Sequence, residues 1–185
     1  MTTAISLVHR LHQHRAWVNQ NLLAAAAQLN DEQLRRPFAI GQGSVWKSLT
    51  HMYAAEYVWL AALQGNENAL APGDVPGQLP GNQQGEDALR TLDELRQKWS
   101  ALEKRWADDL AAHAPESLDE LVYRFSASFG ERFSCRRSDV LLHVCAHAQY
   151  TTAQVVNMLR HLGVEKLPST MLMALARQEA KQQQP

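Results

Sequence analysis

Apolar residues recur every three or four positions along most of this chain, which is the spacing of amphipathic α-helices. The first such segment spans residues 3–29, and its apolar positions are Val8, Leu11, Val18, Leu22 and Leu29. Arg15 interrupts this stripe. The second segment begins at Ser44, which can cap a helix that continues to Leu63. This helix is apolar over more than one face, so we expect it to be deeply buried.

The second half of the chain predicts two more long helices and a short one. The helix at residues 86–113 has one apolar seam, with Leu92, Leu95, Trp99, Leu102, Trp106 and Leu110 at heptad-like spacing. The next helix runs from Ser138 to Leu162, because Gly163 stops it. Ser169 can cap a short fifth helix, and residues 182–185 are expected to be a frayed tail.

Two connections between these helices are unusual. Pro-Gly pairs recur through residues 65–85, which cannot hold a helix and therefore predict a long crossover loop. Such loops serve as lids, partner contacts or mobile linkers, and the linker interpretation is favoured here. After Pro115 the stretch LVYRFSASFGERFSC alternates loosely about Gly130 and predicts a short hairpin-like excursion. Residues 1–185 thus predict one all-α domain, a helical bundle.

Composition narrows the location and the partners of this bundle. A chain of 185 residues with a formal net charge of −1 has no basic surface for nucleic acid. The chain has no run of about 18 apolar residues that could span a membrane, and its N-terminus does not resemble an export signal. We therefore predict a cytoplasmic location. Cys135 and Cys145 lack metal-knuckle spacing and are expected to be inert free thiols.

Three of the eight histidines, namely His51, His143 and His147, fall within long and mostly apolar helices. A neutral imidazole there needs a hydrogen-bond partner or a metal, whereas the other five are expected at the surface. His143 and His147 lie one turn apart, which is the spacing of helical metal sites. Spacing alone favours a structural pair over a metal site. Thr151 lies near the centre of the inner stripe, where a third ligand would fit best.

Other side chains near these histidines are expected to have structural roles. Glu56 points away from His51 on the same helix, and Tyr150 is expected to pack on a neighbouring face. Aromatic residues at helical spacing usually form core rather than a pocket, and we expect this of Trp17, Trp46, Trp59, Trp99 and Trp106.

Three segments, HRAWVNQNLLAAAAQL, GSVWKSLTHMYAAEYVWLAAL and LLHVCAHAQYTTAQVVNMLRHLG, resemble the signature helices of the DinB family, which comprises DinB/YfiT-like metal-dependent proteins. The resemblance implies a four-helix bundle in up-up-down-down order, often homodimeric. It also implies a divalent metal held by one histidine of the second helix and two of the fourth. Some relatives are thiol-dependent S-transferases or isomerases, and many have no established reaction.

Residue by residue, the resemblance places His51 at the helix-two ligand position, within GSxxxxLxH, and His147 at the first helix-four position. The family pattern His-x-x-x-His-Arg-Gly-Gln ends here in Thr151, Thr152, Ala153 and Gln154, so only the glutamine is kept. A threonine hydroxyl is a poor ligand for zinc and similar ions. The third ligand position therefore stays open between Thr151 and His143, which would supply it after a one-turn shift.

Two hypotheses about function follow. In the first, a divalent metal (zinc, nickel or manganese) at His51 and His147 serves a hydrolase or a thiol S-transferase that acts on a small molecule, with a low-molecular-weight thiol implied by the family alone. In the second, the chain is a non-catalytic small-molecule-binding protein or a structural homodimer that has lost the metal. The sequence names neither substrate nor reaction, and it leaves open whether the chain is an enzyme.

Overall fold

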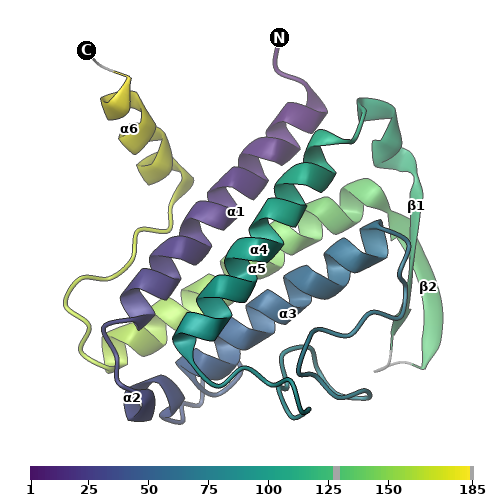
Figure 1. The fold of residues 1–185 in the computed structure, drawn as a ribbon. Helices are drawn as coiled ribbons and strands as arrows, with labels where there is room; N and C mark the ends of the chain where they lie inside the picture. The colour runs from purple at the N-terminus through teal and green to yellow at the C-terminus, as the bar shows by residue number, and fades with distance from the viewer. Residues whose placement is uncertain (127–129, 184–185) are drawn as a thin grey trace.

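Four long helices form the bundle in the computed structural model, which describes residues 1–126 and 130–183 (Figure 1). They are α1 (Ala4–Ala26), α3 (Val45–Leu63), α4 (Leu92–Ala111) and α5 (Arg137–His161). The shorter elements are α2 (Asp31–Arg35), the 3-10 helix η1 (Pro115–Asp119), β1 (Leu121–Ser126), β2 (Glu131–Arg136) and α6 (Leu172–Gln182). The mostly helical fold is confirmed, and the predicted excursion before α5 is an antiparallel two-stranded sheet that pairs Leu121 with Arg136. Residues 127–129 of that excursion lie outside the described residues.

Local capping explains where the helices begin. Ser44 caps α3 as predicted, because its Oγ accepts the backbone N–H of Lys47 at 3.1 Å. The helix predicted from residue 86 starts later in the structure: α4 begins only after Thr91, which forms a capping box with Glu94. The predicted cap at Ser169 is wrong, because α6 begins after Met171 without a side-chain cap. Residues 184–185 of the predicted frayed tail lie outside the described residues.

Helices α3 and α4 run parallel to each other. Trp99 of α4 donates to Glu56 of α3, and further along both helices Gln64 donates to Asp109. Parallel neighbours need a long connection, and residues 64–91 provide it. The Pro-Gly-rich segment is therefore a crossover, as the sequence predicted.

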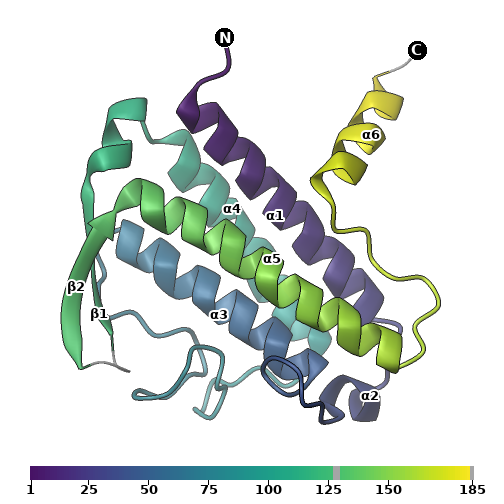
Figure 2. The same ribbon diagram turned by 180° about the vertical axis from the view of Figure 1, so that it is seen from behind.

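Helix α1 runs antiparallel to α4, since His9 contacts the carbonyl of Leu110, whereas Asn19, later in α1, donates to Glu103, earlier in α4. Figures 1 and 2 show α5 running in the same direction as α1. The order is thus up-down-down-up, and the up-up-down-down order expected from the resemblance is wrong for this chain. The reason is that the connection at residues 27–44 reverses the chain, whereas the long crossover does not.

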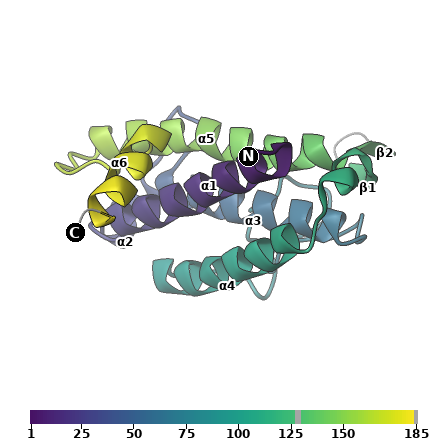
Figure 3. The same ribbon diagram turned by 90° about the horizontal axis from the view of Figure 1, so that it is seen from above.

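The core follows the predicted apolar seams. Viewed from above, α1 and α3 lie between α5 and α4 (Figure 3). Trp46, Trp99 and Trp106 are buried, and the two remaining tryptophans are partly buried against the same core. Tyr150 does not pack as expected, because it is 70% exposed.

Helix α6 lies outside the bundle beside α1 (Figure 2). Arg10 of α1 and Glu179 of α6 form an ion pair at 2.6 Å, and Leu175 is the residue of α6 that is buried. Within the part of the chain that the structure describes, no helix is both long enough and apolar enough to cross a membrane.

Candidate metal site

His51 of α3 and His147 of α5 meet across the bundle. Their Nε2 atoms are 3.1 Å apart, and the ring centroids are 5.0 Å apart at an interplanar angle of 70°. The two helices run antiparallel, so residues from the first half of α3 face residues near the middle of α5. The two histidines that the sequence singled out as ligands are therefore brought together.

The carbonyl of Pro80 fixes the orientation of the His51 ring. His51 Nδ1 lies 2.7 Å from this oxygen, and a carbonyl can only accept, so Nδ1 carries the proton. In the neutral ring the lone pair is then on Nε2, which faces His147. A backbone carbonyl that accepts from the far nitrogen is the usual support for a metal-ligating histidine.

The crossover segment that carries Pro80 is built onto α3. Thr50 Oγ1 donates to the carbonyl of Gly81 at 3.2 Å, and Asp74 accepts the backbone N–H of Gly81 at 2.7 Å. Gly81 has φ +84°, and a Cβ there would overlap the backbone of His51. These contacts make the segment part of the site, whereas the sequence favoured a mobile linker.

Neither candidate for the third ligand completes the site. The His143 ring stacks on that of His147 with centroids 5.9 Å apart, and its other neighbour is Trp59 at 5.3 Å. Thr151 is buried. Among residues 1–126 and 130–183, no three His, Cys, Asp or Glu side chains are grouped so that they could hold a metal ion.

Burial favours the neutral form of the His147 and His143 rings. It lowers the pKa of His147 to about 4, and the nearby His51 and His143 rings add to the effect. Burial also lowers the pKa of His143. Neutral rings at physiological pH have free lone pairs, which is the state that a metal requires.

The spacing of the two Nε2 atoms suits a shared metal. Two nitrogens bound to one tetrahedral zinc at about 2.0–2.1 Å are about 3.3 Å apart, and His51 and His147 come close to this with 3.1 Å. The residues present thus fit two of the ligands. A catalytic zinc site normally uses three protein ligands, so the donor set is incomplete.

A polar cavity gives access to His51. It has a volume of about 470 Å³ and is lined by Gln42, Lys47, His51 and the crossover residues 77–82 and 84. A small molecule that enters it would lie against the histidine that Pro80 orients.

Both cysteines remain free thiols in the described part of the chain. Burial raises the pKa of Cys145 to about 12 and also raises the pKa of Cys135. Thiols with raised pKa values are poor nucleophiles at neutral pH, which agrees with the inert role expected for them.

The sequence missed a buried polar network beside the site. The Glu56 carboxylate forms an ion pair with Arg15 and accepts hydrogen bonds from Asn19 and Trp99, each at 2.9 Å. Arg15 also pairs with Glu103 at 2.8 Å. The signals were Arg15 in an apolar stripe and a glutamate in the middle of a mostly apolar helix.

A second correction concerns the histidines expected at the surface. His12 is only 3% exposed, and burial, reinforced by Arg15, lowers its pKa to about 3. His9 and His14 are partly buried, and their rings contact backbone carbonyls of α4 and of the segment before α6.

The protein is a helical bundle with a pair of histidines between two of its helices, and comparison with known proteins assigns it to a family. The DinB family model matches residues 1–184, so the chain belongs to the DinB family. Its fold is similar to that of YfiT from Bacillus subtilis, described as "a probable metal-dependent hydrolase with an unusual four-helix bundle topology". The TM-score is 0.63 at 15% identity, over 88% of this chain and 91% of that chain, a likeness that shows the fold alone. No curated protein matches the sequence.

Proposed function

We propose that this chain binds a divalent metal at His51 and His147 and uses it on a small molecule, with hydrolysis as the first candidate reaction and thiol S-transfer as the second. The observation that carries the proposal is the meeting of the two Nε2 atoms at 3.1 Å, with the His51 lone pair oriented by Pro80. Family membership and the likeness to YfiT support it.

The incomplete donor set shapes this proposal. Two imidazoles hold a metal weakly, so the third donor would come from water, from the substrate or a thiol, or from His143 after a change of rotamer. When bound, such a metal lowers the pKa of a coordinated water or thiol. The chain itself orients His51 through Pro80, keeps His147 neutral, and admits the substrate through the cavity at residues 77–84.

Metal analysis tests the proposal directly. Purified protein is dialysed to equilibrium against a fixed concentration of zinc, nickel or manganese, with and without a low-molecular-weight thiol, and the metal bound per chain is measured. We expect about one metal per chain, lost in His51→Ala and retained in the control His161→Ala, which removes an exposed imidazole of the same helix as His147. No stoichiometric metal after loading would rule the site out.

A non-catalytic descendant is the second candidate, favoured by Thr151 at the position of the third ligand. Here His51 and His147 are a hydrogen-bonded pair, and the bundle serves as a small-molecule-binding or structural protein. In that case Thr151→His should gain tight metal binding, at least ten-fold above the wild type. If the wild type already matches the affinity of the variant, this candidate loses its basis.

We also propose a homodimer in the cytoplasm. Exposed apolar side chains along α5 and the start of α6, Leu142, Met171 and Met173, support a self-association surface. Sedimentation should give a dimer at micromolar concentration, and a monomer there would contradict this.

A further inference from the structure

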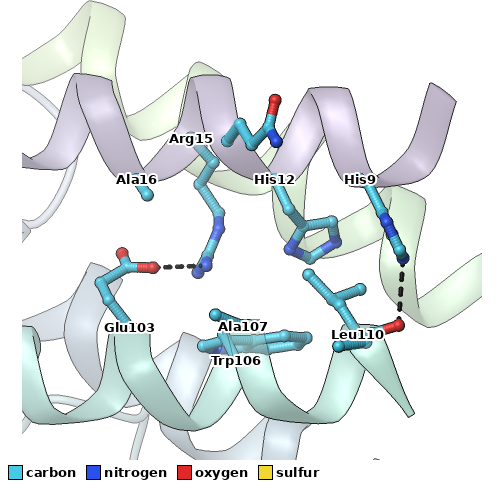
Figure 4. Close-up of a pocket in the computed structure, with 10 residues that line it drawn as sticks. His9, His12, Arg15, Ala16, Glu103, Trp106, Ala107 and Leu110 are labelled. Atoms are coloured by element: carbon cyan, nitrogen blue, oxygen red, sulfur yellow. Dashed lines mark hydrogen bonds and ion pairs between the residues drawn. The ribbon is translucent and has the colours of Figure 1, made fainter. Parts of the chain in front are cut away.

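A second cavity lies between α1 and α4. It is separate from the histidine pair, which lies between α3 and α5. His12 and Arg15 of α1 extend toward α4, whose side of the cavity includes Trp106 and Leu110 (Figure 4). Its volume is about 240 Å³. An apolar cavity of about 150 Å³ is large enough for benzene, so this one has room for a single-ring molecule.

Three of the residues that line this cavity have buried polar atoms without partners. Among the described residues, His12 Nδ1, Arg15 Nε and Trp106 Nε1 are buried and make no hydrogen bond. All three belong to side chains that meet at the indole, because the His12 ring centroid and the Arg15 Cζ lie 5.0 and 4.9 Å from the Trp106 ring. A buried polar atom without a hydrogen-bond partner destabilises the fold, so a cluster of such atoms suggests that a ligand or water binds there.

The three atoms are two donors and one acceptor. Arg15 Nε and Trp106 Nε1 each carry a hydrogen. His12 Nε2 donates to the carbonyl of Leu141 at 3.1 Å, so in the neutral ring Nδ1 has the lone pair. A hydroxyl group accepts two hydrogen bonds and donates one, which is the complement of this set.

Charge at the cavity disfavours an anion. Arg15 is the cation that lines it, and its guanidinium is already paired with Glu56 and with Glu103. An anionic ligand would therefore meet the carboxylate of Glu103, which lines the cavity, and no free positive charge. The lining also includes the neutral Gln13, and its apolar part includes Ala16, Ala107 and Leu110.

The geometry points to a binding site for a small neutral molecule that carries one hydroxyl on an apolar ring, with the hydroxyl held by His12, Arg15 and Trp106. The ring lies against Ala107 and Leu110. This site needs neither His51 nor a metal, so it stands or falls independently of the proposed metal site.

Phenol is the probe, and the indole N–H signal of Trp106 is the reporter. That signal is identified in proton–nitrogen NMR spectra as the one lost in Trp106→Phe. Phenol should shift it saturably with one site per chain. Benzene lacks the hydroxyl and should bind about five-fold more weakly, which is the effect of one neutral hydrogen bond. Benzoate should bind at least ten-fold more weakly, because its charge has no partner.

Two variants of α4 locate the binding. Ala107→Leu fills the cavity from an exposed helix position, and Ala101→Leu makes the same change at an exposed position of α4 outside the lining. We expect Ala107→Leu to abolish the phenol shift and Ala101→Leu to leave it unchanged. The proposal is overturned if phenol gives no saturable shift up to millimolar concentration, because the cavity then holds only water. It is also overturned if benzene and phenol bind with equal affinity, or if the shift persists in Ala107→Leu.

Discussion

Replacing Arg15 with methionine should test the buried network most severely. The Arg15 and Glu56 side chains are each only 2% exposed, so the variant leaves a carboxylate in the core without its cation. Removing one partner of a buried ion pair costs about 3–5 kcal/mol. At about 2–4 °C per kcal/mol for a domain of this size, we expect Tm to fall by about 6–20 °C.

The cost should depend on pH, because Glu56 can take up a proton. Burial raises the pKa of Glu56 to about 7 from its usual 4.5, although Arg15 opposes the shift. The folded state then holds more protons than the unfolded state between these values, so the contribution of this group to stability decreases as pH rises from about 4.5 through 7. Without Arg15 the pKa of Glu56 rises further. The penalty of Arg15→Met relative to wild type should therefore be smaller at pH 5 than at pH 8.

Urea unfolding at the two pH values measures both effects, and Glu56→Gln in the Arg15→Met background is the matched control. The carboxamide is neutral, and its oxygen can still accept from Trp99. The double variant should regain most of the lost stability and lose the pH effect. A single-variant cost below about 1 kcal/mol at pH 8, or one that is equal at pH 5, would refute the reasoning.

Three further changes test the crossover and the caps. Gly81→Ala should cost about 2–4 kcal/mol in urea unfolding, from its φ of +84° and the overlap with His51, whereas Gly77→Ala at φ +78° meets no neighbour and should cost about 1–2 kcal/mol. Equal costs would contradict the close approach. Asp74→Ala removes the acceptor of two backbone N–H groups, so hydrogen exchange in the crossover should speed up while the bundle stays protected. Thr91→Ala removes a cap and should lower Tm by about 2–4 °C, and no change would mean that the cap contributes little.

The helices themselves could be predicted from the sequence because apolar periodicity and Pro-Gly pairs are local signals. Ser44 capped α3 as expected, whereas the helix predicted from residue 86 begins only after Thr91, which is the residue that caps α4. Helix direction is not a local property. Whether α4 runs with or against α3 depends on how the crossover packs, and nothing in the periodicity encodes that.

The buried polar residues of α1 show why the sequence did not predict the whole core. His12, Arg15 and Asn19 continue the buried row between Val8 and Leu22, at alternating spacings of four and three residues. A search for apolar stripes discards such residues as surface. They are buried because Glu56 and other groups from distant segments pair with them, and partners of that kind cannot be identified from one helix alone. By contrast, His51 and His147 were found because apolar neighbours surround them and a family motif marks both positions.

The buried network and the histidine pair are linked through α3. Glu56 follows His51 by five residues, so the two side chains leave the helix on well-separated faces, one toward α1 and α4 and the other toward α5. A rotation of α3 that moved His51 away from His147 would also draw Glu56 away from Arg15 and leave the Glu56 carboxylate buried without its cation, while Arg15 would still pair with Glu103. Breaking this buried ion pair costs several kcal/mol, far more than one imidazole hydrogen bond contributes. The network therefore restricts the rotation of α3 about its axis. The histidine geometry therefore depends on charges that lie on the other side of the same helix.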